Sequence, residues 1–146
     1  MVHVKPHGAL YNKAAMDRPV ANAIVRAIWD FDPELRLFAL SQSQLIAAGQ
    51  AEGLRTVSEV FADRNYQSDG TLVPRSQPQA IINSDKIISE RMLKLLEQGT
   101  VLSLDGQEIP LVAETICLHG DEKEALGHAL ALRQALQKNG FVIAAV

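Results

Sequence analysis

The chain of 146 residues is the size of one ordinary domain and is long enough to bury a core. Its 47% hydrophobic and 21% charged residues are typical of a globular protein. The net charge of −3, without a basic run interleaved with aromatic residues, argues against nucleic acid and anionic membranes as partners. Cys117 is the only cysteine, and no apolar run approaches the length of a transmembrane helix, so we expect a cytoplasmic protein.

Strands and helices are predicted to alternate along the first half of the chain. Asp17 is a favourable N-cap, and Pro19 fits the first turn of the helix that follows. That helix is predicted to end at Asp32-Pro33. The elements expected in this half are a strand at 2–5, a helix at 17–32, a strand at 35–40, a helix at 43–52 and a strand at 57–62.

The second half begins with an aperiodic stretch at 63–79, and a loop of this length is usually functional or disordered. The elements expected after it are a helix at 84–99, a hairpin at 101–111 around Asp105-Gly106, a strand at 115–119, a helix at 121–139 and a strand at 141–146. The helix at 121–139 is expected to begin with a capping-box-like pair of Asp121 and Glu124. Its buried stripe is expected to be Ala125, Ala129, Leu132 and Leu136. This alternation predicts one α/β domain of parallel strands with crossover helices and a small hairpin.

The first polar constellation is the run from Lys5 to Asn12, which follows the first predicted strand. Ligands of parallel α/β folds bind at the carboxyl ends of strands. Lys5 offers a positive charge, His7 a proton carrier or metal ligand, and Tyr11 a hydroxyl group. The alternative is a surface histidine beside a turn.

The second constellation surrounds the end of the strand at 57–62. Glu59 falls within an apolar strand, where a buried carboxylate requires a partner. Asp63 and Arg64 leave the strand end, and Arg75 has the geometry to bind a carboxylate or phosphate with two hydrogen bonds. The alternative is a structural network of ion pairs that ties the long loop to the sheet.

The third constellation is His119-Gly120-Asp121, at the end of another apolar strand. His119 is a candidate general acid or base or a ligand, and Asp121 either orients it or caps the next helix, which we favour. His128 lies within a predicted helix, where exposure or packing explains it. The chain has no Walker A loop, dinucleotide-binding glycine motif, H-E-x-x-H, C-x-x-C or G-x-S-x-G sequence.

Three segments together resemble signatures of the LamB/YcsF family. They are KPHGALYN at 5–12, EVFADRNYQSDGTLVPR at 59–75 and ICLHGD at 116–121, in the order of the family. The resemblance implies a (β/α) barrel of the seven-stranded deacetylase-like type, of which this chain is the C-terminal portion. The N-C-D-x-G-E-like and G-F-H-A-G-D-like segments that begin the family domain are absent from the sequence.

The resemblance also implies an activity and a set of site residues. The family's enzyme is a 5-oxoprolinase that opens 5-oxoproline to L-glutamate with ATP as co-substrate, and two further subunits complete it. Tyr11 and Arg75 are added to this set because of their positions in the first and second polar constellations. The resulting assignment is catalytic for His7, Asp63 and His119 and substrate-binding for Lys5, Tyr11, Glu59, Arg64, Arg75 and Asp121.

We expect phosphorylation of the lactam oxygen, with Arg64 or Lys5 holding negative charge and His7 or His119 activating water with Asp63. One alternative is a metal-dependent amide or sugar deacetylase, which requires a divalent ion. Another is a non-catalytic assembly module. A partial barrel exposes strand edges, so we expect pairing with another chain, a second copy included, or low stability alone.

Overall fold

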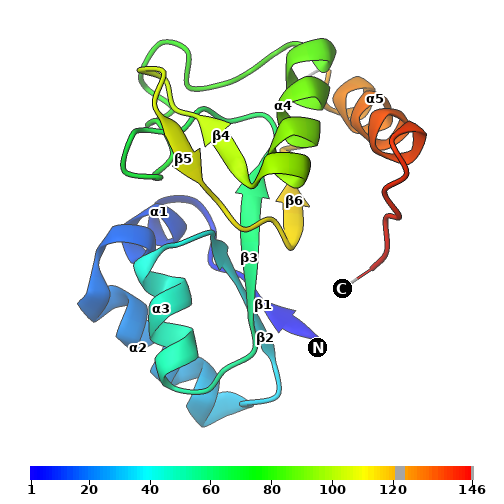
Figure 1. Ribbon diagram of the computed structural model, residues 1–146. Coiled ribbons are helices and arrows are strands. Elements are labelled where there is room, and N and C mark those ends of the chain that lie inside the picture. Colours follow the sequence, from blue (N-terminus) through cyan, green and yellow to red (C-terminus); the bar gives the residue numbers. More distant parts are fainter. Residues whose placement is uncertain (121–123, 146) are drawn as a thin grey trace.

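A computed structural model describes residues 1–120 and 124–145, and its centre is a parallel sheet of four strands (Figure 1). The strands are β1 (His3–Val4), β2 (Arg36–Leu40), β3 (Thr56–Phe61) and β6 (Thr115–Cys117). They pair in the order β1-β2-β3-β6 and are all parallel. Neighbouring strands therefore follow the order of the chain, as in one arc of a (β/α) barrel.

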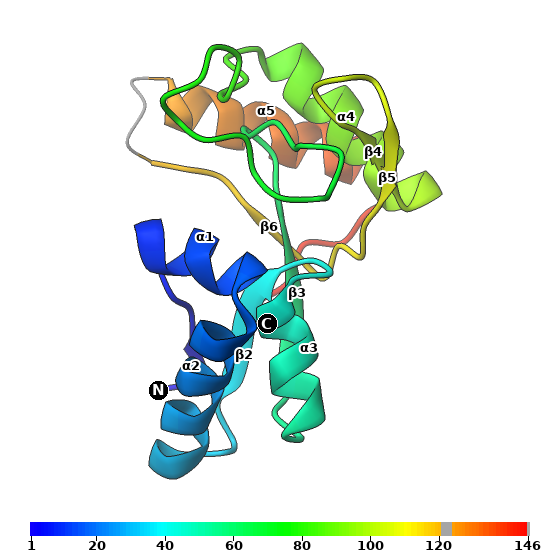
Figure 2. The ribbon, with the colours of Figure 1, turned by 90° about the vertical axis from the view of Figure 1, so that its left-hand side faces the viewer.

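The helices form two groups along this sheet. The first group is α1 (Gly8–Met16), α2 (Arg18–Phe31) and α3 (Gln44–Ala51), and the second is α4 (Asp85–Gln98) and α5 (Ala125–Lys138). Figures 1 and 2 show the first group around β1 and β2, and α4, α5 and an antiparallel hairpin at the other end. The hairpin consists of β4 (Thr100–Leu102) and β5 (Glu108–Pro110), as predicted. The predicted α/β class is confirmed.

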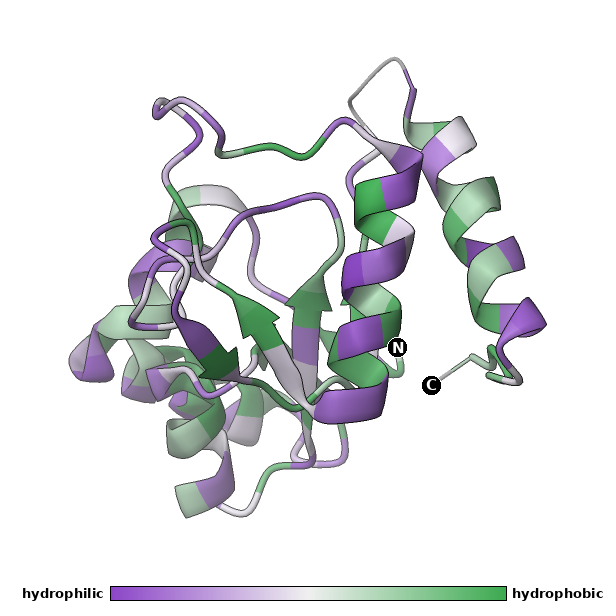
Figure 3. Cartoon of the chain, turned by 45° about the horizontal axis from the view of Figure 1, so that its top comes forward, coloured by the Kyte–Doolittle hydropathy of each residue, from purple (hydrophilic) through white to green (hydrophobic). Residues whose placement is uncertain are grey.

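Side chains alternate between the two faces of each strand, and this alternation separates core from site. Leu37 and Ala39 of β2 belong to the apolar cluster that contains buried residues of α2 and α3. Val60 of β3 packs in the cluster that contains buried residues of α4 and α5. Glu59 and Phe61 have the opposite parity, so their side chains leave the strand on its other face, where the Phe61 ring still belongs to the same apolar cluster. Figure 3 shows strands that are mostly hydrophobic and helices that carry bands of both kinds.

The residues predicted to begin and end α2 and α4 lie at the ends of these helices. The Asp17 carboxylate accepts a hydrogen bond from the Val20 backbone N–H, with Pro19 in the first turn of α2. Ser84 caps α4 in the same way, and that helix ends at Gly99, whose φ of 71° is favourable for glycine. Within the described ranges, no helix has the length and apolar character needed to cross a bilayer.

The structure differs from the prediction near both ends of the chain. Helix α1 (Gly8–Met16) was not predicted, because it follows a Pro-His-Gly sequence and buries only three side chains, Tyr11, Ala14 and Ala15. The strand predicted at 141–146 is wrong over 141–145, which form no strand. Strand propensity requires a neighbouring strand to pair with, and Val142 is instead 91% exposed.

The buried face of α5 is also different from the prediction. Leu132 and Leu136 are buried as expected, but Ala129 is exposed and His128 is buried in its place. The His128 Nδ1 atom forms a hydrogen bond with the Asp85 carboxylate of α4, and this contact turns His128 towards α4. Glu124, one member of the predicted capping pair, makes no capping hydrogen bond. The other member, Asp121, lies outside the described residues.

Gly49 provides a test of how closely α3 approaches the sheet. A Cβ atom at Gly49 would lie 2.7 Å from Thr56 Cγ2 and 3.0 Å from Leu37 Cδ2. We predict that Gly49→Ala lowers the free energy of unfolding by about 1–3 kcal/mol through overpacking, although alanine favours a helix. Thermal or urea denaturation measures the change.

Gly127 of α5 is the matched control, because a Cβ atom there would meet nothing within 4 Å. Gly127→Ala is expected to raise the free energy of unfolding by up to about 1 kcal/mol. Stabilisation by both substitutions would show that α3 does not require glycine at this contact.

Candidate functional site

A cleft of about 770 Å³ lies at the carboxyl ends of β1, β3 and β6. All three polar constellations contribute to its wall, which confirms that the strand ends bring them together. The predicted site residues that line the cleft are Lys5, His7, Tyr11, Arg64, Arg75 and His119. Glu59 and Asp63 lie immediately behind this wall and bind residues that form it.

Glu59 is a buried carboxylate that joins β3 to the N-terminal segment. Its Oε1 atom accepts a hydrogen bond from Lys5 Nζ at 2.6 Å, and its Oε2 atom accepts one from the Tyr11 hydroxyl at 2.9 Å. Burial raises the pKa of the Tyr11 hydroxyl well above its usual value, and the charge of Glu59 adds to this. Tyr11 therefore remains a hydrogen-bond donor, and Glu59 positions two residues of the cleft.

Lys5 lies among aromatic rings as well as beside Glu59. Its Nζ atom is 5.5 Å from the Phe61 ring centroid and 5.7 Å from that of Tyr11, distances at which a cation is attracted to a ring. Lys5 also contacts Cys117 Sγ at 3.4 Å. Burial, with the charge of Glu59, raises the pKa of the Cys117 thiol, so this group stays protonated.

Asp63 and His119 form the second anchored pair of the site. His119 Nδ1 lies 2.9 Å from Asp63 Oδ2, and the His119 backbone N–H donates to the same carboxylate at 3.0 Å. Burial alone would raise the pKa of Asp63, but the hydrogen bonds and charge of His119 outweigh it and hold the pKa below its usual value. The His119 ring is stacked on Phe61, with 5.5 Å between ring centroids.

The carboxylate beside His119 is thus Asp63, whereas Asp121, the other candidate for this role, lies outside the described residues. Asp63 follows β3 and His119 follows β6, and these strands are neighbours in the sheet. Because Asp63 holds the Nδ1 side of the ring, Nε2 is the nitrogen left for proton exchange in the cleft.

The remaining predicted residues differ in exposure. Arg64 is buried, and its guanidinium donates to the carbonyl groups of Ala80 and Val73 in the loop at 62–84 that joins β3 to α4. Arg75 and His7 are both exposed at the edge of the cleft. Arg64 therefore supports the loop, while Arg75 and Lys5 bring positive charge to the wall.

Phe61 and Cys117 are site residues that were missed in the sequence. Both line the cleft, and they are register partners on neighbouring strands. The available signal was the two-residue period of a strand, which places Phe61 on the same face as Glu59, and Cys117 on the same face as His119 if the strand continues. Among residues 1–120 and 124–145, no three His, Cys, Asp or Glu side chains are grouped to hold a metal ion.

The whole chain, residues 1–146, matches the family model described as LamB/YcsF family. It is 49% identical over 146 residues to the A subunit of a 5-oxoprolinase from Bacillus subtilis (strain 168), covering 100% of this chain and 57% of that protein. It is 52% identical over 145 residues to the protein of that name from Geobacillus kaustophilus (strain HTA426), covering 99% and 57%.

A crystal structure of a lactam utilization protein from Thermus thermophilus has the same fold. It matches with a TM-score of 0.89 and 40% sequence identity, over 100% of this chain and 58% of that chain. The chain therefore spans less than two thirds of the length of these relatives.

Asp63→Asn tests the depressed pKa of the Asp63 carboxyl. Because the folded-state pKa lies below the unfolded value of about 3.9, ionised Asp63 stabilises the fold above that pH. This contribution is lost as the pH falls through the folded-state value. We predict that the variant loses about 1–3 kcal/mol of unfolding free energy at pH 5 and that the deficit shrinks towards pH 3.

Urea denaturation at a series of pH values between 5 and 3 measures this effect. Asp30→Asn is the control, because Asp30 is exposed and forms its ion pair with Arg26 on the same helix. A deficit that stays constant over the range would contradict the depressed pKa.

Lys5→Met tests the buried pair of Lys5 and Glu59. The substitution leaves the Glu59 carboxylate buried with Tyr11 as its remaining partner, so we predict a loss of about 3–5 kcal/mol of unfolding free energy. In the double variant Lys5→Met/Glu59→Gln the loss should be clearly smaller than the sum of the two single losses. Additive losses in the double-mutant cycle would show that the two groups are not coupled.

Proposed function

Because the chain belongs to the LamB/YcsF family, we propose that it acts in a 5-oxoprolinase as the A subunit of that enzyme. The proposed reaction opens 5-oxoproline, a five-membered lactam, to L-glutamate with hydrolysis of ATP. Two relatives that are named as 5-oxoprolinase subunits match nearly the whole chain, and a structural relative is a lactam utilization protein. The observation that carries the proposal is the His119–Asp63 pair facing a cleft that also contains Lys5.

A lactam carbonyl is a poor electrophile, because the ring nitrogen donates electron density to it. Transfer of a phosphoryl group from ATP to the lactam oxygen makes the ring carbon more electrophilic. Water then adds to that carbon, and the ring C–N bond breaks as the nitrogen gains a proton. The acyl phosphate that remains is hydrolysed by a second water molecule to L-glutamate and inorganic phosphate. The site must therefore accept a proton from water, return one to the amine and stabilise anionic groups.

The residues of the cleft suit these tasks. In the proposed mechanism, His119 Nε2 accepts the proton of the attacking water, and Asp63 orients the ring and stabilises its charged form. His119 then protonates the leaving nitrogen. Lys5 and Arg75 hold the substrate carboxylate or the phosphoryl oxygens. His7, at the edge of the same cleft, is the second candidate for proton transfer.

The proposal includes ATP as co-substrate and two further subunits as partners. The relatives are each named as one subunit of an enzyme, which supports an assembly of several chains. No step is assigned to a divalent ion, because His119 and Asp63 form only a pair and the described part of the chain adds no third ligand beside them. The metal-dependent deacetylase considered from the sequence therefore has no supporting geometry in these residues.

Turnover of the assembled enzyme tests these roles. We predict that Asp63→Asn and His119→Gln, in the chain combined with its proposed partners, each lower kcat by about 10²–10⁴-fold, because proton transfer loses its base or the group that orients it. Glutamate formation and phosphate release from ATP are measured with 5-oxoproline present and absent.

Arg26→Gln is the control, because Arg26 is exposed on α2 and forms its ion pair with Asp30 of the same helix. Circular dichroism checks that each variant is folded. If His7→Ala and Asp63→Ala both leave turnover unchanged, the assignment of the site is wrong.

A further inference from the structure

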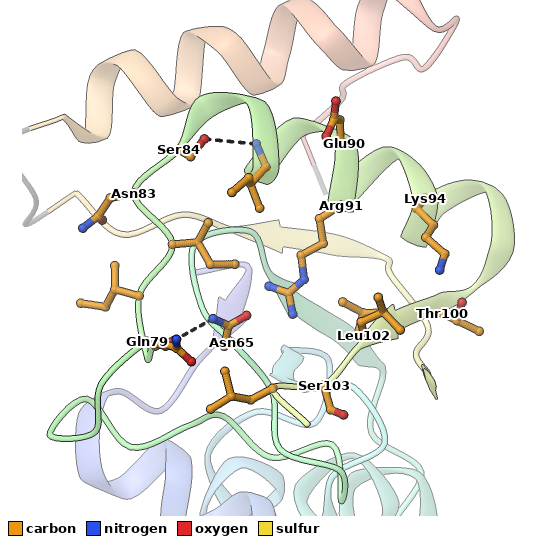
Figure 4. Close-up of a pocket in the computed structure, with 15 residues that line it drawn as sticks. Asn65, Gln79, Asn83, Ser84, Glu90, Arg91, Lys94, Thr100, Leu102 and Ser103 are labelled. Carbon is orange, nitrogen blue, oxygen red and sulfur yellow. Dashed lines mark hydrogen bonds between the residues drawn. The ribbon is translucent and has the colours of Figure 1, made fainter. Parts of the chain in front are cut away.

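A second cleft, of about 620 Å³, lies between α4, the loop at 62–84 and β4 (Figure 4). It shares no lining residue with the cleft of the proposed active site. Both its polar and its apolar side chains come from the loop, α4 and the hairpin. The residues that matter below are Asn65, Ile87, Arg91, Thr100, Leu102 and Leu104.

Arg91 is the charged group at the centre of this cleft, and Figure 4 shows its side chain extending from α4 into the cleft. Its Nη1 atom donates to the Arg64 carbonyl at 2.6 Å, and its guanidinium carbon lies 5.2 Å from the Tyr66 ring centroid. Its Nη2 atom is buried and has no hydrogen-bond partner in the described structure. An unpaired N–H of a buried cation is unfavourable, and an acceptor brought by a ligand would remove this penalty.

Arg91 differs in this respect from the other cation of the cleft. Lys94 forms an ion pair with Glu108 at 2.9 Å. No carboxylate of the described residues forms an ion pair with Arg91. Burial lowers the pKa of the Arg91 guanidinium, but arginine remains charged under all ordinary conditions. Glu90, the carboxylate that lines the same cleft, lies 3.9 Å from Lys86. Arg91 is therefore the charged group of the cleft that forms no ion pair within the described residues.

The edge of β4 that faces away from β5 provides unpaired backbone groups. Ser103 N–H donates to the Gln107 carbonyl and Leu111 N–H donates to the Gly99 carbonyl, both at 2.8 Å. In an antiparallel pair the bonding direction alternates, so the N–H and C=O groups of Thr100 and Leu102 point away from β5. No described residue forms a backbone hydrogen bond with them, whereas the next N–H on this edge, that of Leu104, already donates to the Tyr66 carbonyl at 2.8 Å. An extended peptide has room to pair there as an additional strand.

Large apolar side chains border the same cleft on the solvent side. Ile87 is 53% exposed, Leu102 is 47% exposed and Leu104 is 42% exposed. Exposed apolar side chains gathered at one cleft are typical of a protein-binding surface. A small anion would use Arg91 alone, whereas a peptide strand would also cover these side chains and the edge of β4.

We propose that this cleft docks an extended, acidic segment of another subunit of the assembled enzyme. The segment adds to the free edge of β4, covers Ile87, Leu102 and Leu104, and places an Asp or Glu carboxylate on Arg91. Nη2 is covered in the isolated chain, so the carboxylate reaches it when a side chain at the rim turns aside. The partner rests on the function proposed above, in which this chain works in a complex.

A second copy of this chain does not supply such a strand from its unpaired C-terminal segment. Residues 141–145, with the sequence FVIAA, form no strand of their own sheet and are in that respect available for pairing. They contain no carboxylate side chain to bind Arg91. A partner subunit with an acidic, β-prone segment supplies the carboxylate that this C-terminal segment does not have. Docking would also affect the position of Asp63 beside the first cleft, because Arg91 binds the carbonyl of Arg64, the residue that follows Asp63.

Photo-cross-linking in the assembled complex tests the proposal. A benzophenone amino acid at Leu104 should cross-link to an Asp- or Glu-containing segment of a partner subunit, which mass spectrometry of the cross-linked peptides identifies. The same group at Phe31, which is 72% exposed on α2, should give no such product. A complex that forms without a cross-link from position 104, or with one to a segment lacking acidic residues, would overturn the proposal.

Binding of the partner subunits to variants provides the second measurement. Arg91→Gln should raise the Kd at least tenfold, and so should Leu102→Asp, which places a negative charge beside the incoming segment and leaves Arg91 unchanged. Arg26→Gln and Leu126→Asp are the controls, since both residues are exposed on helix surfaces outside this cleft. Thermal denaturation checks that the variants are folded.

The outcomes separate this inference from the proposed function. If the complex forms and turns over 5-oxoproline while the Arg91 and Leu102 variants bind as tightly as the unmodified chain, the docking site is wrong and the function stands. If the unmodified chain neither binds the partner subunits nor supports turnover with them, the proposed function fails and the docking proposal fails with it.

Discussion

The structure depends on one buried carboxylate, that of Glu59. It lies on the face of β3 opposite α4 and α5 and accepts hydrogen bonds from Lys5, at the end of β1, and from Tyr11 of α1. Without such partners a buried carboxylate is strongly unfavourable. The N-terminal segment is therefore held over the sheet by charge as well as by packing, and this brings Lys5 and His7 to the wall of the cleft.

The pleat of the strands explains why core and site occupy the same short elements. In β3, Val60 and Phe61 are both buried among apolar residues but leave the strand on opposite faces, and Glu59 shares the face of Phe61. The same face supplies the Phe61 ring, which packs edge-on against the Tyr11 ring and is stacked on the His119 ring. One aromatic side chain thus packs against both anchored groups of the site, and its loss would disturb both.

The loop at 62–84 connects the two clefts. Arg64 holds this loop through the carbonyl groups of Ala80 and Val73, and Arg91 of α4 holds the Arg64 carbonyl. Tyr66 continues the connection, because its hydroxyl accepts a hydrogen bond from the Phe61 N–H at 2.8 Å. The Arg91 guanidinium and the His119 ring are therefore linked through contiguous hydrogen bonds and packing.

Much of this arrangement follows from the sequence. Asp17 and Pro19 define the start of α2, the apolar runs define the strands, and three polar motifs follow strand ends that parallel pairing brings to one edge. The motifs also indicate the LamB/YcsF family, which the match over residues 1–146 confirms. These features are local or periodic, so the chain order alone contains them.

Other features were decided by contacts between distant residues. Asp63 meets the His119 imidazole across a separation of 56 residues, because β3 and β6 are neighbours. Arg64 binds loop carbonyl groups, α5 turns His128 inward to meet Asp85, and the segment at 141–145 forms no strand because it pairs with none. The sequence alone determined which groups stand at the strand ends. Only the tertiary structure decided their partners, because a hydrogen bond or ion pair depends on distances that packing sets.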